Sequence, residues 1–472
     1  MSTRMQLTLI SLATLSAFVL SIIFASTGVV RDDPDRNIVI PEELVMDLKV
    51  KAAYNDTDVF WRFEWPAEDG DWYHDYLVYQ GGEWVRYGRS QAGSDPYGTY
   101  EDRLTFFVDD GSVEYFEQYG GFITIVSDMR FMTLDVSPEE AQAHIGRDDV
   151  RKFLPDTRTN PHDWRTLKSE EELQALQEAG YFLDLWHWRA HRSNPIGFAD
   201  DQHISWYRLG DDGRGAYTTN WDGDAATPAF MFDPAQTGQH AMRWDRVLNR
   251  EYGQDDFYYL SEEIAVPFDP DHGWQEGDVI PRRLLREPTG SRGSIFANGI
   301  WQEGQWNLDL VRALDTGSPL DDKALQDKGI YNVAFAVHRS ATGSRWHYIS
   351  FPFSLGLDRP TADIVAGQFQ GATPPWDEIE WTEMTLFYPG QITWDHVFSP
   401  AHAGYEAMKD KAHVRTAHSE ETLSLYAVES EFRDEIKGQW IQTLAASVFF
   451  AAVVSLSVVR LAGRKDEEDE LL

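Results

Sequence analysis

The sequence predicts a mainly-β protein, an antiparallel β-sandwich with one membrane helix near each end of the chain. Three observations lead to this prediction. Short segments rich in β-branched and aromatic residues recur between turn signals. Most of them alternate with period two, which places one face of each strand in a core. Two long uncharged apolar runs lie near the ends of the chain.

The strand candidates lie in the part of the chain before residue 360. In the segment 183–191, alternation places Trp186 and Trp188 on one face and His187 on the other. The 18 Trp, 20 Tyr and 26 Phe residues supply a large apolar core and exclude a disordered chain. The expected strands are 58–66, 76–88, 103–111, 121–128, 181–190, 331–339 and 346–355.

Helical signals are sparse between the two apolar runs. Ser169 can cap a helix over 169–180, because acidic residues fill its first turn and Gly180 can end it. We find no internal repeat and no low-complexity linker. The sequence therefore predicts one elaborated sandwich over residues 31–360, followed by a loop-and-helix extension over 361–437.

The first apolar run spans residues 5–30 and follows Arg4. Its length suits a bilayer-spanning helix. A secretory signal peptide is the competing interpretation, because small residues near Ala25 offer a cleavage site. Residues 1–30 are therefore expected to be a signal anchor or a signal peptide.

The second apolar run covers 441–459, within an expected membrane helix over 438–462. Arg460, Arg464 and Lys465 follow it, and these cations predict a cytoplasmic C-terminus. A buried core helix is the alternative. Residues 463–472 would form a short acidic cytosolic tail. The expected location is the cell membrane, with the main domain on its periplasmic or extracellular side.

Composition excludes several classes of function. The 78 Asp and Glu residues outnumber the 41 Lys and Arg residues, which gives a net charge of −37 and makes a nucleic-acid partner implausible. Cysteine is absent, so disulfides, thiolate metal sites and covalent haem attachment are excluded. No serine-hydrolase, zinc-protease or phosphate-loop motif is found. We interpret the adjacent acids Asp200 and Asp201 as a turn or a cap.

Three segments carry residues that could hold a haem. Imidazole and thioether groups are good axial ligands of haem iron, and arginine is a good partner for its propionates. Each residue taken alone is more often structural. The candidates are Met129 and Met132 in 125–132, His187, Arg189 and His191 in 183–192, and His338, Arg345 and His347 in 338–351.

Several stretches resemble the haem-binding domain family of the ethylbenzene dehydrogenase gamma subunit, also described as a DMSO reductase-like haem-binding domain. The resemblance implies an immunoglobulin-like or DOMON-like β-sandwich that holds a noncovalent haem b through Met and Lys. It also implies electron exchange with a molybdenum-type oxidoreductase in the periplasm. The matching stretches are 51–66, 100–113, 150–158, 183–201, 299–314 and 329–357.

The resemblance places the family's lysine near Arg189, which cannot bind iron because it stays charged. His187 or His191 would serve instead, while Arg189 or Arg345 would meet a propionate and His347 would contribute to the cofactor site. The family's methionine falls in 121–132, so Met129 is expected to be the second iron ligand, with Met132 as the alternate.

Three functions follow from these observations. The first is a membrane-anchored b-type cytochrome that transfers electrons, without substrate chemistry of its own. The second is a haem-free sandwich that binds a sugar or another small molecule through stacking on tryptophan. The third is a structural subunit of a membrane redox complex.

Overall fold

The computed structural model describes residues 45–87, 100–124, 136–339 and 347–387, together with residues 15, 16 and 18 and part of 441–460. The chain divides into two compact units. One unit comprises Met1–Val39 and Ser419–Leu472, and the other comprises Ile40–His418. The description below concerns the second unit, which contains the described strands.

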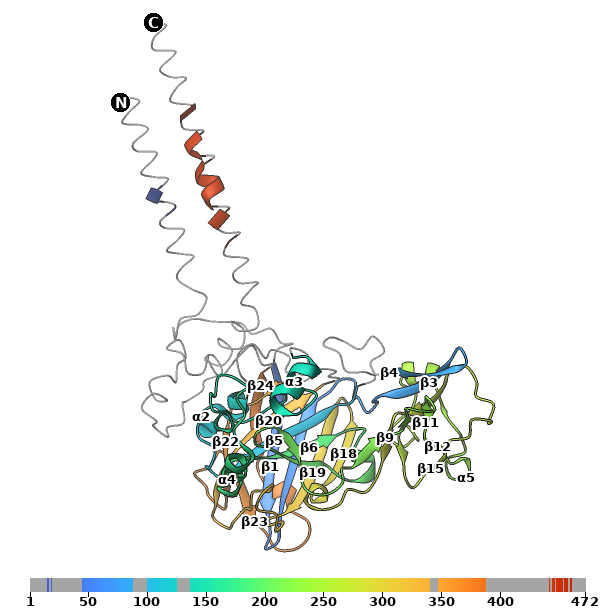
Figure 1. Ribbon diagram of the computed structural model, residues 1–472. Helices are drawn as coiled ribbons and strands as arrows, with labels where there is room; N and C mark the ends of the chain where they lie inside the picture. Colours follow the sequence, from blue (N-terminus) through green and yellow to red (C-terminus); the bar gives the residue numbers. More distant parts are fainter. Residues whose placement is uncertain are drawn as a thin grey trace, which may run out of the picture. The chain divides into compact units, whose positions relative to one another are not determined.

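Within the described residues, thirteen strands form one large sheet (Figure 1). Eleven strands follow one another along the sheet, while β21 and β24 lie beside this path and pair with β20 and β1. Along the sheet the strands are β18 (Phe296–Gln302), β19 (Gln305–Ala313), β2 (Asp58–Pro66), β1 (Val45–Tyr54), β23 (Ile364–Gln368), β22 (Phe353–Leu357), β20 (Ile330–His338), β5 (Arg103–Asp109), β6 (Leu183–Arg189), β7 (Asp200–Ile204) and β8 (Arg208–Gly210); the side strands are β21 (Tyr348–Ile349) and β24 (Thr382–Phe387).

The mainly-β prediction is confirmed, but the large sheet is mixed and not purely antiparallel. Strand β23 runs parallel to both of its neighbours, β1 and β22. Period-two alternation reveals which face of a strand is buried and carries no information about strand direction. The parallel pairs therefore could not be read from the pattern of apolar residues.

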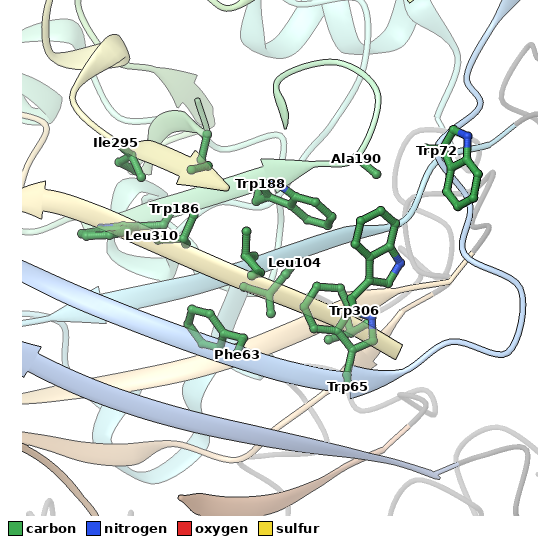
Figure 2. Packing of buried hydrophobic residues seen from close by; sticks show 14 of the residues in the cluster. Phe63, Trp65, Trp72, Leu104, Trp186, Trp188, Ala190, Ile295, Trp306 and Leu310 are labelled. Carbon is green, nitrogen blue, oxygen red and sulfur yellow. The ribbon is translucent and has the colours of Figure 1, made fainter. Parts of the chain in front are cut away.

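Aromatic side chains from the two halves of the sheet meet in the core. The ring of Trp61 on β2 lies 5.1 Å from that of Phe106 on β5, and Phe106 lies 5.0 Å from Trp186 on β6. Trp188 packs at 5.0 Å from Trp306 on β19 (Figure 2). The predicted strand over 183–191 is confirmed for 183–189, with both tryptophans in the core cluster.

Smaller sheets occupy the region 208–290, together with a hairpin from 76–87. The small sheets are β13 (Met242–Arg243), β16 (Asp278–Pro281), β3 (Tyr76–Gln80) and β4 (Glu83–Tyr87); β14 (Leu260–Ser261), β17 (Arg283–Leu285) and β9 (Tyr217–Thr219); β10 (Trp221–Asp222) and β11 (Thr227–Pro228); and β12 (Phe230–Phe232) and β15 (Ala265–Pro267). The small sheet with the most strands has four, and it pairs this hairpin (β3 and β4) with two later strands, β16 and β13.

The predicted helix over 169–180 is confirmed as α4 (Glu170–Glu178). The Ser169 hydroxyl accepts the backbone N–H of Glu172, whose side chain in turn accepts the Ser169 N–H. The other helices described between residues 45 and 387 are short: α2 (Phe116–Tyr119), α3 (Pro138–Ile145), α5 (Pro234–Thr237), α6 (Trp244–Leu248), η2 (Gly120–Thr124), η3 (Pro155–Thr157), η4 (Asn194–Ile196), η5 (Ser291–Gly293) and η6 (Trp376–Glu378).

The strand predicted over 121–128 is wrong for its first four residues, which belong to the 3₁₀ helix η2. Gly120 adopts a φ of +53°, which turns the chain away from extended geometry. The Thr124 hydroxyl then donates to the Gly121 carbonyl within the same turn. This local hydrogen bond competes with strand formation.

The segments on either side of the large sheet in the sequence are described to different extents. The large sheet continues beyond residue 360 through β23 and β24, while 388–437 lies outside the described residues. Most of 5–30 and part of 441–459 also lie outside them. In the part that the structure describes, no helix has both the length and the apolar character needed to cross a membrane.

Candidate functional site: a histidine-lined pocket

A pocket lies against the face of β20, β5 and β6 that points away from the aromatic core. Its cavity volume is about 60 Å³. Ala336, Thr105 and His187 stand side by side on the three strands, because the strand register pairs each with the next. Apolar side chains form much of the wall: Phe107, Leu185, Ala334 and Ile349.

His187 is the central polar group of the pocket and is only 1% exposed. Its Nδ1 lies 3.0 Å from Arg189 Nη2, 3.3 Å from Arg208 Nη2 and 3.3 Å from Gln202 Oε1. Its Nε2 has no hydrogen-bond partner among the described residues. Burial, followed by the charge of Arg189, holds the pKa of His187 well below its usual value. The ring is therefore neutral, the form in which imidazole binds metals.

Two more histidines line the same pocket. The rings of His338 and His347 stack with centroids 4.5 Å apart and planes inclined by 17°. Both side chains are buried. Burial, with the neighbouring Arg103 next in importance, lowers the pKa of His338 well below its ordinary value. His187 and His338 thus present neutral imidazoles to the wall.

Arg208 and Lys152 bring positive charge to the pocket. Arg208 donates from Nε to Gln202 Oε1 at 3.0 Å, and no carboxylate within the described residues forms an ion pair with it. Burial and then the nearby Arg151 lower the pKa of Arg208 to about 9. Lys152 Nζ donates to the Thr124 hydroxyl at 3.0 Å. A pocket with such a wall is electrostatically suited to an anionic group.

Arg189 lies behind His187 and not in the pocket wall. Its Nη1 donates to Asp200 Oδ2 at 2.8 Å, and Arg292 Nε donates to the other oxygen of the same carboxylate at 2.7 Å. The expectation that Asp200 belongs to a turn or cap is wrong, because it lies on β7 and is 1% exposed. Asp200 therefore forms ion pairs with two guanidinium groups close to His187.

His191 belongs to a different environment from His187. Its Nδ1 lies 2.9 Å from the Trp72 carbonyl oxygen, and its ring lies 6.0 Å from that of Tyr76. The side chain is fully buried and does not line the pocket. The structure thus brings His187 and His347 together and places His191 apart.

The other sequence-predicted ligands lie outside the described residues. Met129 and Met132 fall in 125–135, and Arg345 falls in 340–346. In the sequence, the first segment follows η2, and the second lies between His338 and His347.

Sequence reasoning missed Lys152, Gln202 and Arg208. The alternation of 200–204 could have revealed that Gln202 lies on the same strand face as Asp200. Lys152 and Arg208 could not be found in this way, because only the folding of separate segments brings them to the wall.

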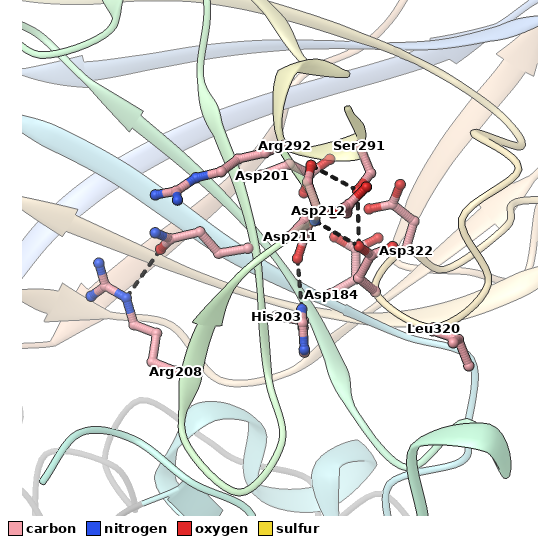
Figure 3. Close-up of polar contacts among 12 residues, drawn as sticks. Asp184, Asp201, His203, Arg208, Asp211, Asp212, Ser291, Arg292, Leu320 and Asp322 are labelled. Carbon is pink, nitrogen blue, oxygen red and sulfur yellow. Dashed lines mark hydrogen bonds and ion pairs between the residues drawn. The ribbon is translucent and has the colours of Figure 1, made fainter. Parts of the chain in front are cut away.

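A second buried polar cluster contains Asp184, Asp201 and Asp322, whose side chains gather in Figure 3. Arg312 forms ion pairs with all three carboxylates. This guanidinium is 1% exposed and lies 2.7 Å from Asp184, 3.0 Å from Asp201 and 3.3 Å from Asp322. Oxygens of the three carboxylates lie within 4.8 Å of one another. Arg312 already supplies a positive charge to them, so we interpret the cluster as a structural ion network. The expectation that Asp201 forms a turn or cap is accordingly also wrong.

A neutral acid extends this cluster towards His203. Asp211 Oδ1 lies 2.6 Å from His203 Nδ1 (Figure 3). Burial and the neighbouring Asp201 raise the pKa of Asp211 to about 12, while burial lowers that of His203 to about 4. Both shifts assign the shared proton to Asp211, which donates to a neutral imidazole.

These features define a mainly-β protein whose large sheet bears a cationic, histidine-lined pocket. A family model described as ethylbenzene dehydrogenase matches residues 15–350. The match covers well over half of the 472 residues, and the chain belongs to this family.

One curated relative shares a shorter region with the chain. Cytochrome c-552 from Stutzerimonas stutzeri is 28% identical over 93 residues. This region is 20% of the present chain and 30% of the relative, so the chain spans less than a third of the length of that protein.

Proposed function

We propose that this protein is a membrane-anchored, extracytoplasmic b-type haem protein that acts in electron transfer. The observation that carries the proposal is the side chain of His187. It offers a neutral, buried imidazole whose Nε2 lacks a hydrogen-bond partner among the described residues, in a pocket with an apolar wall. Membership of the ethylbenzene dehydrogenase family and the similarity to a cytochrome support the same function.

The side chains of the pocket offer the kinds of donor group that a haem requires. His187 would hold the iron through Nε2, and Met129 would supply the second ligand from the segment that follows η2. Arg208 and Lys152 would hold the propionates, because Arg189 is already engaged by Asp200. A bound haem supplies one-electron transfer, whereas the protein positions the group, excludes water and tunes its potential.

The attachment would be noncovalent, because the chain contains no cysteine. This feature rules out the thioether linkage of a c-type haem. We further propose that the redox partner is a molybdenum-type oxidoreductase. The apolar runs 5–30 and 441–459 support a membrane location for this partnership.

The test is an absorption spectrum of the full-length protein, purified in detergent after expression with ample haem. We expect a low-spin Soret band, and we expect His187→Ala to abolish or change it. His162→Ala is the matched control, because His162 is exposed and does not line the pocket. Absence of the band from the wild-type protein would refute the proposal.

Met129→His provides a second arm of the experiment. It should preserve haem binding and lower the reduction potential, because thioether ligation raises a haem potential relative to imidazole ligation. An unchanged potential would remove Met129 from the ligand set and leave haem binding intact.

A further inference from the structure

Strand β18 is an edge of the large sheet, because among the described strands it pairs only with β19. In an antiparallel strand, alternate residues direct both of their backbone groups to the same side. Ala297, Gly299 and Trp301 direct theirs away from β19. Phe296 and Ile300 on the same strand are 55% and 49% exposed. An apolar edge of this kind is a template on which another chain can add a strand.

Two side-chain amides occupy this edge. Asn194 Oδ1 accepts the Gly299 N–H at 2.7 Å, while Asn194 Nδ2 donates to the Gly299 carbonyl at 2.8 Å. Gln254 repeats the arrangement two residues later. Its Oε1 accepts the Trp301 N–H at 3.0 Å, and its Nε2 donates to the Trp301 carbonyl at 2.8 Å. A carboxamide carries a donor and an acceptor like those of a peptide group, so the two side chains make the hydrogen bonds that a neighbouring strand would make.

The orientation of both amides follows from their partners. Asn194 Oδ1 also accepts from Trp188 Nε1 at 2.9 Å, and an indole N–H can only donate. Reversing the Gln254 amide would place its nitrogen against the Trp301 N–H and its oxygen against the Trp301 carbonyl. Each amide therefore has one orientation that satisfies all of its partners.

The rest of the sheet boundary is protected in other ways. At the start of β18, the Ala297 N–H donates to the Gly197 carbonyl at 2.9 Å, and Phe198 forms an isolated antiparallel bridge with Phe296. At the opposite end of the sheet, β8 has only three residues, and a short strand is a poor template for pairing. The part of the edge at Gly299 and beyond is thus left to the two amides.

We propose that Asn194 and Gln254 substitute for a neighbouring strand and thereby keep a second copy of this chain from pairing with β18. Two copies of one edge suit each other, because a two-fold antiparallel pair needs only a single self-complementary surface. Such a pair would satisfy the backbone groups of Gly299 and Trp301 in both copies. It would also place exposed apolar side chains of the two strands beside one another. The inference does not depend on haem binding, because neither amide lines the pocket.

The chain contains no cysteine, which permits a specific cross-linking test. Ile300→Cys places one thiol on β18 of the full-length protein, purified in detergent and treated with a short bis-maleimide. We expect almost no covalent dimer while both amides are present. Adding Asn194→Ala and Gln254→Ala should raise the dimer fraction by roughly tenfold, because each lost amide releases two hydrogen-bonding groups of the edge.

Two controls separate pairing of β18 from general association. Asn249→Ala with Gln236→Ala removes one asparagine and one glutamine from exposed positions, and it should leave the dimer fraction unchanged. Leu248→Cys in place of Ile300→Cys puts the thiol on another exposed apolar residue, and there the alanine pair should produce no rise.

A further variant covers loss of folding, because Asn194 also contacts the core through Trp188. Gln254→Ala alone spares that contact and should still give a smaller rise in dimer. Ile300→Lys added to the alanine pair should keep the protein monomeric in sedimentation, because a charge on an edge strand opposes pairing. Near-ultraviolet circular dichroism identifies the folded variants. If a folded Gln254→Ala variant yields no more dimer than Gln236→Ala, or if the wild-type edge already cross-links as strongly, the proposal is overturned.

Discussion

Adjacent residues of β6 serve two different environments. Trp186 and Trp188 are fully buried in the aromatic core, while His187 points to the pocket on the opposite face. Trp188 also donates from Nε1 to the Asn194 side-chain oxygen at 2.9 Å. Packing of the two tryptophans in the core thus holds β6 in place. A change in this packing would shift the β6 backbone and, with it, the side chain of His187.

Gly299 allows Trp188 to occupy its place in the core. A methyl group at residue 299 would lie 2.4 Å from the Trp188 ring, closer than any real contact. We expect Gly299→Ala to lower the free energy of unfolding by about 1–3 kcal/mol, the usual cost of overpacking. Gly367→Ala is the control, because its methyl group would meet no atom within 4 Å. Equal unfolding midpoints in urea for the two variants would contradict this explanation.

At the scale of strands, buried ion pairs link side chains of β6, β7 and β19. Asp184 and Asp201 lie on β6 and β7, and Arg312 on β19 lies between their carboxylates. Buried ion pairs contribute little net stability, but removing one partner leaves a charge uncompensated. The cluster therefore favours the correct association of these strands more than it adds to overall stability.

Arg312→Met tests this role. We expect it to cost about 3–5 kcal/mol of unfolding free energy, because Asp184, Asp201 and Asp322 lose their shared cation. Arg62→Met should cost at most about 1 kcal/mol, because its ion pair with Asp309 is partly exposed. Thermal unfolding of both variants provides the measurement. A similar loss of unfolding free energy in the two variants would show that the buried ion pairs of Arg312 contribute no more to stability than the exposed pair of Arg62.

At the scale of the whole molecule, the distribution of charged and apolar residues indicates which parts of the chain are suited to water and which to a membrane. The net charge of −37 favours a hydrated, soluble surface, while the two apolar runs favour a membrane. Among the described residues of the second run, Phe449 and Phe450 are helical and each is 71% exposed. Such exposed apolar side chains are suited to contact with lipid.

The membrane orientation can be tested with reporter fusions. Arg460, Arg464 and Lys465 follow the second run, so we expect a C-terminal fluorescent protein that matures only in the cytoplasm to be active. A reporter that requires the extracytoplasmic side should be active when inserted in the exposed turn at Gly81 and Gly82. The opposite pattern would reverse the proposed topology.

Local sequence determined the features that depend on neighbours in the chain. Alternation placed Trp186 and Trp188 opposite His187, the capping residues located α4, and the absence of cysteine excluded covalent haem. Each of these follows from contacts or chemistry within a few residues.

Tertiary structure alone decided which distant groups meet. It paired β23 in parallel with β1, buried Asp200 beneath Arg189 and Arg292, and brought Arg208 to the wall beside His187. Arg312 and Asp184 are separated by 128 positions in the sequence, yet they form one ion pair. A local pattern indicates that a side chain is buried, but it does not identify the residue that the side chain contacts. That residue is determined by the register and folding of the whole sheet.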